Sequence, residues 1–334
     1  MLARASTTGY ICSRNDLCTA RGDDAMKLEG LHHITMITAD AQRNVDFYAD
    51  VLGLRLVKTT VNFDDPGAYH LYFGDERGAP GSILTFFEYA GAERGRAGLG
   101  MIHTVQLGVP AEALDLWEAR LAAAGHPAVR EDGVLRFEDP DGLGLELVVA
   151  DDGNPPLRAE HPEIPAASAI TGVEGVRAFS EYAYVEERLL TDTLGFTYLG
   201  DGRYRLDGEE RHVHWTFDPP TTNGRPGAGT VHHIAWASQD ADHVAWRDRI
   251  AAAGGLVTDV IDRDYFDAIY FRTPRGILFE IATMSPGFAV DEDPDRLGEE
   301  LRVPAIHAHL RECLERTLTP IANPRAVRRA AGTR

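Results

Sequence analysis

An internal repeat limits the folds open to this chain more than any other feature of the sequence. The segment WEARLAAAG at residues 117–125 is echoed by WRDRIAAAG at 246–254, and DVLGL at 50–54 is echoed by DTLGF at 192–196. Repetition of this kind indicates a chain assembled from copies of one supersecondary unit. We therefore expect the 334 residues to form several similar modules.

Each repeat has the pattern of one strand, one helix and three further strands. In the first repeat, a strand-like run is followed by apolar residues at helical spacing and by three short strands with turns between them. Module one resembles module three, and module two resembles module four. The boundaries that we predict are a disordered leader at 1–25, module one at 28–90, module two at 100–150, a linker at 151–168, module three at 171–218, module four at 229–284, and a C-terminal tail with a helix at 285–334.

Composition points to a small-molecule partner. With 33 basic and 52 acidic residues the net charge is -19, which argues against a nucleic-acid or anionic-membrane surface. No apolar run approaches the roughly 20 residues of a membrane span. The three cysteines favour neither a disulfide framework nor a thiolate zinc site, so we expect a cytoplasmic protein. Residues 1–25 lack the apolar stretch of a secretory signal, and Met26 is a candidate for the natural start.

The four modules, with a histidine on a first strand and a glutamate on a last strand, resemble the vicinal oxygen chelate superfamily. This superfamily includes glyoxalases, extradiol dioxygenases and antibiotic-binding resistance proteins. The resemblance implies an α+β fold in which four βαβββ modules form two open barrel-like domains. The segments that resemble the hydroquinone ring-cleaving dioxygenases, within a match from about residue 28 to 304, are LHHIT at 31–35, YHLYF at 69–73, VHH at 231–233, residues 263–270 with RTP at 272–274, and residues 287–293.

The candidate metal ligands are two histidines and one glutamate. Because neighbouring residues on a strand point to opposite faces, one histidine of each adjacent pair can face a metal. The resemblance favours His33 and His233, and Glu280 on the last strand of module four completes the set. The matching position in module one is Thr85, which makes a poor ligand.

Two histidines and one carboxylate are the ligand set of non-haem Fe(II) oxygenases, which leave coordination positions open for substrate and O2. We therefore predict Fe(II) as the cofactor, with Mn(II) as a substitute, and a small aromatic diol and O2 as partners. For ligands from modules one and four to share a metal, these modules must pack together. Modules two and three then form the other pair.

The resemblance also implies further catalytic residues. It assigns Tyr270 and Arg263 to proton transfer and to binding of the second substrate oxygen, and it places Thr35 near the metal. His32 and His232, beside the ligand histidines, are expected to support them.

Three alternatives stay open at this point. Module two carries its own pair, His103 and Glu146, so a second metal site is one hypothesis, with a polar-lined remnant as the other. The protein could instead be a glyoxalase-like lyase or isomerase with a four-ligand Ni or Zn site. It could also be a metal-free small-molecule-binding resistance protein. A homo-oligomer is expected, because relatives commonly form one.

Overall fold

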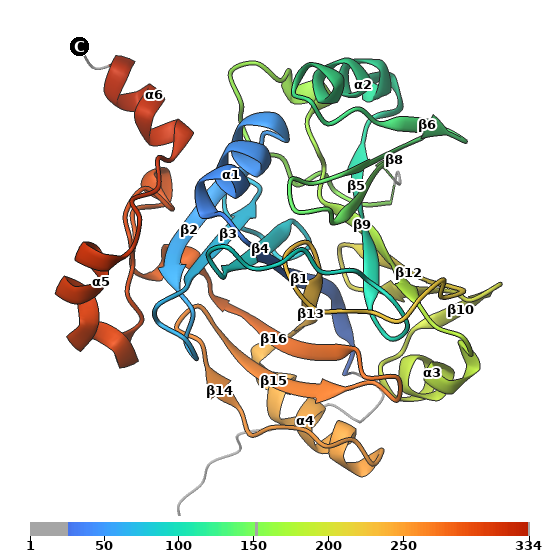
Figure 1. The fold of residues 1–334 in the computed structure, drawn as a ribbon. Helices are drawn as coiled ribbons and strands as arrows, with labels where there is room; N and C mark the ends of the chain where they lie inside the picture. Colours follow the sequence, from blue (N-terminus) through green and yellow to red (C-terminus); the bar gives the residue numbers. More distant parts are fainter. Residues whose placement is uncertain (1–25, 151–152, 333–334) are drawn as a thin grey trace, which may run out of the picture.

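The computed structural model describes residues 26–150 and 153–332, and the predicted leader at 1–25 lies outside this range. The described chain contains four βαβββ modules (Figure 1). Module one comprises β1 (Leu28–Thr38), α1 (Ala41–Val45) continued by a π-helix (Asp46–Val51), β2 (Arg55–Val61), β3 (Tyr69–Gly74) and β4 (Ile83–Glu88). Module two comprises β5 (Ile102–Val109), a 3-10 turn (Ala111–Ala113), α2 (Leu114–Ala123), β6 (Val129–Glu131), β7 (Val134–Glu138) and β8 (Gly144–Val149).

The second half of the chain repeats this order. After a 3-10 turn (Ala166–Ser168), module three comprises β9 (Val173–Phe179), α3 (Tyr184–Arg188) continued by a π-helix (Leu189–Thr193), β10 (Thr197–Gly200), β11 (Arg203–Asp207) and β12 (His212–Asp218). Module four comprises β13 (Val231–Ser238), a 3-10 turn (Asp240–Asp242), α4 (His243–Ala252), β14 (Ile261–Asp262), β15 (Phe266–Arg272) and β16 (Leu278–Pro286).

The strands form two eight-stranded sheets, and the predicted pairing of modules is confirmed. One sheet, with the order β14-β15-β16-β13-β1-β4-β3-β2, joins modules four and one. The other, with the order β10-β11-β12-β9-β5-β8-β7-β6, joins modules three and two. In the middle of each sheet the first strands of the two modules pair in antiparallel fashion, β13 with β1 and β9 with β5. We call the two sheets the 1+4 and 2+3 half-barrels.

The first helix of module one is shorter than its apolar spacing predicts. The spacing predicts a helix over residues 40–52, whereas α1 ends at Val45 and the chain continues as a π-helix to Val51. Asp40 begins the helix because its carboxylate accepts a hydrogen bond from the backbone N–H of Arg43. The positive φ of 71° at Gly53 then turns the chain into β2.

The C-terminal segment packs along β2, at the left of Figure 1. It contains short 3-10 turns (Phe288–Val290, Pro294–Arg296 and Ala305–Leu310), α5 (Arg311–Thr317) and α6 (Pro324–Gly332). An amphipathic helix over 304–318 is typical of the sequence pattern, but the first half of this stretch is a 3-10 turn. Leu314 is buried, while Ile306 is 67% exposed. The segment is held by the buried ammonium of Lys58, which pairs with Asp291 at 2.7 Å and with Glu292.

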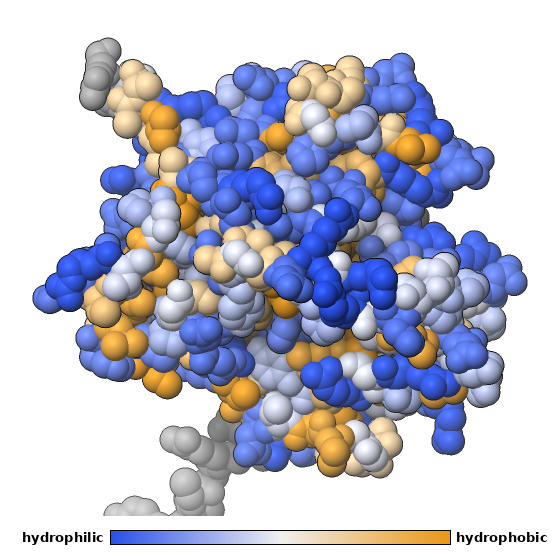
Figure 2. Space-filling view, in the orientation of Figure 1, coloured by the Kyte–Doolittle hydropathy of each residue, from blue (hydrophilic) through white to orange (hydrophobic). Residues whose placement is uncertain are grey.

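The surface is mainly polar. Figure 2 shows a largely hydrophilic face on which hydrophobic areas are small and separate. Among the described residues, no helix is long and apolar enough to cross a membrane.

Candidate metal centre

Three adjacent strands of the 1+4 half-barrel bring His33, His233 and Glu280 together. His33 lies on β1, His233 on β13 and Glu280 on β16, and these strands are neighbours in the sheet. These residues are 2%, 5% and 0% exposed. Within residues 26–150 and 153–332, no other group of three His, Cys, Asp or Glu side chains has its ligand atoms within 4.8 Å of one another.

The spacing of the three ligand atoms fits one metal ion. His33 Nε2 lies 3.3 Å from His233 Nε2 and 3.5 Å from Glu280 Oε2, and His233 Nε2 lies 3.0 Å from the same oxygen. A triangle with these edges has a point about 2.1 Å from each atom, which is the usual length of a metal bond to His or carboxylate. The trio can therefore hold a divalent cation on one face, leaving the opposite face open.

The neighbouring histidines orient the two imidazoles. His32 Nδ1 lies 2.8 Å from His33 Nδ1, and His232 Nδ1 lies 2.8 Å from His233 Nδ1. With Nδ1 occupied in this way, each Nε2 is turned toward the shared point, as in metal sites whose ligands are held by an outer hydrogen bond. Burial, followed by the charge of His33, lowers the pKa of His32 to about 3, so this supporting ring is neutral.

The carboxylate of Glu280 is a second indication that the site fits a metal ion. Burial opposes its charge, but His33 and His233 hold its pKa well below the ordinary value, so it is ionised. Its Oε2 approaches both Nε2 atoms and its carboxylate lies beside Tyr270, but among the described residues neither oxygen has a hydrogen bond of good geometry. A fully buried anion with few well-placed donors is costly unless a cation compensates it. The donor set therefore suits a metal better than it suits a set of protein hydrogen bonds.

A cavity of about 400 Å³ opens beside the three ligand atoms. Its walls combine aromatic rings with a few polar groups, and they include Phe63, Phe87, Phe266, Asn62, His70, Tyr72, His232, Arg263 and Tyr270. The volume and the apolar walls suit a small aromatic ligand.

Two of the predicted catalytic residues act as one unit at the cavity wall. The guanidinium of Arg263 donates a hydrogen bond from Nε to the hydroxyl of Tyr270 at 3.2 Å and lies over the ring of Phe63 at 5.4 Å. Its other end pairs with Asp64 at 3.5 Å. Burial and the charge of Glu280 raise the pKa of Tyr270, so its phenol keeps its proton.

The remaining predicted residues are divided between the cavity and the wall behind it. His232 lines the cavity, whereas His32 lies behind His33 and packs on Phe266 at a ring-centroid distance of 4.9 Å. Thr35 is fully buried and bonds to Thr85 at 2.8 Å. Thr35 is thus close in sequence to His33 but does not line the cavity.

Two cavity residues, His70 and Tyr72, have no role in the sequence-based assignment. Both lie in the YHLYF segment at 69–73, but a resemblance to a family segment does not show which of its side chains face inward. Strand alternation offers a partial signal, since residues 70 and 72 share one face of β3.

The hypothesis that His103 occupies the position of a ligand histidine is wrong. In module four, the ligand histidine lies two residues before the residue that faces its glutamate across the ladder. In module two, Glu146 faces Gln106, so the equivalent position is Thr104. His103 is displaced by one residue. It takes the place of a supporting histidine, and its Nδ1 bonds to Thr104 Oγ1 at 2.9 Å.

Among the described residues the 2+3 half-barrel contains no ligand trio, and its polar side chains pair with one another. His103 Nε2 lies 2.9 Å from the carboxylate of Asp218, and its ring stacks on Phe179. Glu146 accepts hydrogen bonds from Arg136 Nε at 2.9 Å and from Gln106 Nε2 at 2.7 Å. An arginine therefore neutralises this carboxylate.

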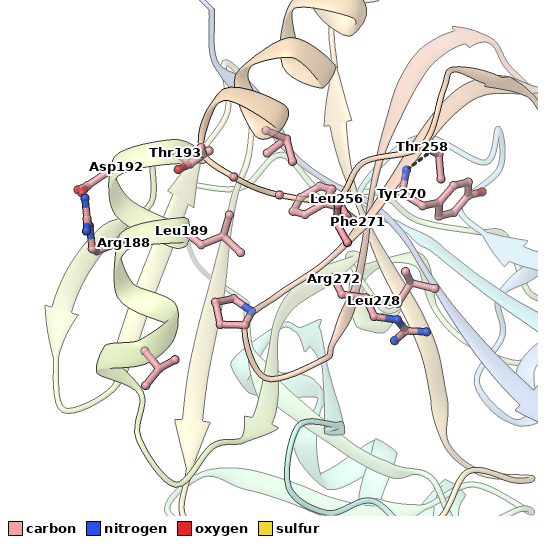
Figure 3. A pocket seen from close by; sticks show the side chains of 16 residues that line it. Arg188, Leu189, Asp192, Thr193, Leu256, Thr258, Tyr270, Phe271, Arg272 and Leu278 are labelled. Carbon is pink, nitrogen blue, oxygen red and sulfur yellow. Dashed lines mark hydrogen bonds and ion pairs between the residues drawn. The ribbon is translucent and has the colours of Figure 1, made fainter.

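A larger hollow of about 780 Å³ lies on the outer side of β15, next to α3 and the end of α4. Figure 3 shows its walls, where Arg188 pairs with Asp192 and the exposed Leu256 forms the rim. It shares Thr258, Tyr270 and Leu278 with the first cavity, but it contains none of the three ligand residues. Its size alone does not make it the chemical site.

Comparisons with known proteins agree with the geometry. The profile of the Glyoxalase/Bleomycin resistance protein/Dioxygenase superfamily matches residues 30–147 and 188–281. The chain is 45% identical over 305 residues to the protein named ring-cleaving dioxygenase MhqO of Bacillus subtilis, which covers 89% of this chain and 97% of that protein. It is 34% identical over 306 residues to the chlorohydroquinone/hydroquinone 1,2-dioxygenase of Sphingobium indicum, with 83% and 92% covered.

Solved structures show the same fold. A crystal structure of a Bacillus subtilis protein described as a dioxygenase aligns with a TM-score of 0.83 at 43% identity, covering 90% of this chain and 99% of that one. Glyoxalase I from Zea mays aligns with a TM-score of 0.53 at 15% identity, covering 76% and 92%. The second likeness supports the fold alone.

Proposed function

Because the chain belongs to the Glyoxalase/Bleomycin resistance protein/Dioxygenase superfamily, we propose that it is a ring-cleaving dioxygenase of the extradiol type. Its substrate is a hydroquinone or a catechol-like diol, which it opens with O2. Fe(II), for which Mn(II) can substitute, is held by His33, His233 and Glu280. The observation that carries the proposal is the buried trio of two imidazoles and one carboxylate beside an aromatic-walled cavity.

The charge of the ligand set favours a phenolate. Burial lowers the pKa of His233, so the imidazole is neutral, while Glu280 contributes one negative charge. A divalent cation held by these residues would keep a net charge of about +1 and would supply Lewis acidity that favours a deprotonated diol over a neutral one.

The residues of the cavity position the ring and hold protons. Phe63, Phe87 and Phe266 offer flat apolar surfaces for the aromatic substrate and exclude water from it. Tyr270 retains its proton, receives the hydrogen bond from Arg263 and lies beside Glu280 at the cavity wall, where its hydroxyl can donate to a substrate oxygen. Arg263 also places a positive charge near any negative charge that develops on the ring.

Thr85 argues against a glyoxalase-type site with a fourth protein ligand. It occupies the position in module one that Glu280 occupies in module four, since Thr35 faces Thr85 and Ala235 faces Glu280. Its hydroxyl is bonded to Thr35 and to His70. It is therefore committed to the protein and points to no metal.

Oxygen uptake by the reconstituted protein tests the proposal. The protein is loaded with Fe(II) under anaerobic conditions, its iron content is determined, and O2 consumption is recorded with a panel of hydroquinones and catechols. We expect stoichiometric uptake and loss of the aromatic absorbance with at least one diol. Stoichiometric iron without uptake for any diol would refute the proposal.

A further inference from the structure

A chain of hydrogen bonds leads from the cavity into the sheet of module one. It joins the hydroxyl of Tyr72 to His70 Nδ1 at 2.9 Å, His70 Nε2 to Thr85 Oγ1 at 2.9 Å, and Thr85 Oγ1 to Thr35 Oγ1 at 2.8 Å. The ladder sets this spacing, because Tyr72 faces Thr85 across β3 and β4, and Thr85 faces Thr35 across β4 and β1. All four side chains are buried, so the groups at the two ends decide which atoms donate.

Thr35 is the buried end of this hydrogen-bond chain, away from the cavity. It is 0% exposed and does not line the cavity, and within the described residues Thr85 is the one side-chain partner of its hydroxyl. A buried donor left without an acceptor costs about 1 to 3 kcal/mol. Thr35 therefore donates to Thr85, and the Thr85 hydroxyl in turn donates to His70 Nε2.

This direction fixes the proton of His70. Burial, followed by the charges of His33 and His233, lowers the pKa of His70 well below its ordinary value, so the ring carries a single proton. With Nε2 acting as the acceptor, the proton lies on Nδ1 and is donated to the oxygen of Tyr72.

Tyr72 is the end of this hydrogen-bond chain that lies at the cavity. It lines the cavity, and its hydroxyl is close enough to Tyr270 and Glu280 for both to affect its titration. Burial, followed by the effects of Tyr265 and Tyr270, raises its pKa well above the ordinary value, so it keeps its proton. Because its oxygen already accepts from His70, its own O–H is left to donate into the cavity.

We propose that Tyr72 is a substrate-binding residue that donates a hydrogen bond to an oxygen of the bound aromatic diol, and that His70 is a positioning residue that fixes this direction. The inference rests on the proposed function. Sheet symmetry supports it, because Tyr72 faces Thr85 as Tyr270 faces Glu280. The two tyrosines thus approach the cavity from equivalent strands, and the oxygen of each accepts an N–H, from His70 for Tyr72 and from Arg263 for Tyr270.

The tautomer of His70 tests the positioning role without any turnover. Nitrogen-15 NMR of histidine-labelled, zinc-loaded protein reports which ring nitrogen is protonated, and a His70→Gln variant assigns the signals. We expect the proton on Nδ1 in the wild type. Thr85→Val removes the hydroxyl that donates to Nε2, so the proton should shift toward Nε2. A wild-type His70 with its proton on Nε2 would overturn the assigned direction.

Anaerobic titration of the zinc-loaded protein with hydroquinone tests the binding role. Tyr72→Phe should weaken binding by about 5- to 10-fold, which is the usual effect of one hydrogen bond. Tyr265→Phe is the matched control, because Tyr265 belongs to the same aromatic cluster but does not line the cavity. Unchanged affinity in Tyr72→Phe, or equal losses in both variants, would overturn the proposal.

The two proposals fail in different experiments. Iron-loaded protein that consumes no O2 but binds hydroquinone, and binds it less tightly after Tyr72→Phe, refutes the dioxygenase and leaves the role of Tyr72 supported. Oxygen uptake with normal affinity in Tyr72→Phe refutes the role of Tyr72 and leaves the dioxygenase supported.

Discussion

The 1+4 and 2+3 half-barrels share one framework but treat a buried carboxylate in opposite ways. Glu280 and Glu146 occupy equivalent positions on the last strands of modules four and two. Across the ladder Glu280 faces Tyr270, whereas Glu146 faces Arg136. Glu146 is neutralised by that arginine, while Glu280 is left for a cation that the two histidines would share. The residue at the facing position is therefore one of the differences between a structural ion pair and a candidate metal centre.

Backbone crowding also keeps the 2+3 half-barrel from holding a metal. Its positions equivalent to the ligand histidines are Thr104 and Gly175. A Cβ at Gly175 would lie 2.6 Å from Gln106 Oε1 and 2.9 Å from the carbonyl oxygen of His214. Since backbone cannot move aside as a flexible side chain can, a histidine does not fit there.

The largest expected effect is loss of the metal. His33→Ala and His233→Ala should each abolish stoichiometric Fe(II) binding, because two remaining ligands do not hold the ion. His103→Ala, the matched change in the other half-barrel, should leave the iron content unchanged. Metal analysis after anaerobic reconstitution measures all three variants. Loss of iron in His103→Ala would contradict the division of roles between the half-barrels.

The comparison also shows how far sequence alone leads. The repeats predicted four modules, and the need for one shared metal point predicted which modules pair. The prediction of a ligand position for His103 in module two was wrong because a match of residue types along the chain does not fix the register of the strands. His103 is one residue from the expected position, and on a strand one residue reverses the direction of the side chain.

Contacts between strands were harder to predict than the strands themselves. The hydrogen-bond chain from Tyr72 to Thr35 joins three strands. The register of the strand ladders, rather than spacing in the sequence, decides which side chains bond to one another. The tail had the apolar period of a helix, but Ile306 remains exposed because no strand or helix of the described chain covers it. Periodicity predicts an element, whereas burial depends on what packs against it.

A second prediction concerns equivalent turns of the two half-barrels. Asp139 and Thr273 both accept a hydrogen bond from the backbone N–H four residues later, but only Asp139 can ionise. Burial, with Asp141 adding to it, raises the pKa of Asp139 to about 6 from an ordinary 3.8. The stabilisation from its protonated form is complete below about pH 4 and is lost as the pH rises through 6.

Asp139→Asn should remove this dependence. From pH 4 to pH 7 the free energy of unfolding of the wild type should fall by up to about 3 kcal/mol relative to the variant. Urea denaturation of both proteins at several pH values measures the difference. A difference that stays constant between pH 4 and pH 7 would show that the two turns are electrostatically alike.

The smallest expected effect lies at the position that separates the half-barrels. Arg136→Met leaves the carboxylate of Glu146, which is 5% exposed, with Gln106 as its remaining side-chain donor. The arginine side chain is 40% exposed, so solvent screens part of the pair, and we expect a loss of about 1 to 2 kcal/mol in the free energy of unfolding. Tyr270→Phe, at the equivalent position, should leave stability within about 0.5 kcal/mol and lower oxygen uptake instead. Urea denaturation and oxygen consumption of both variants separate the two roles. Equal stability losses would mean that the facing residue is structural in both half-barrels, and that Tyr270 is no more specialised than Arg136.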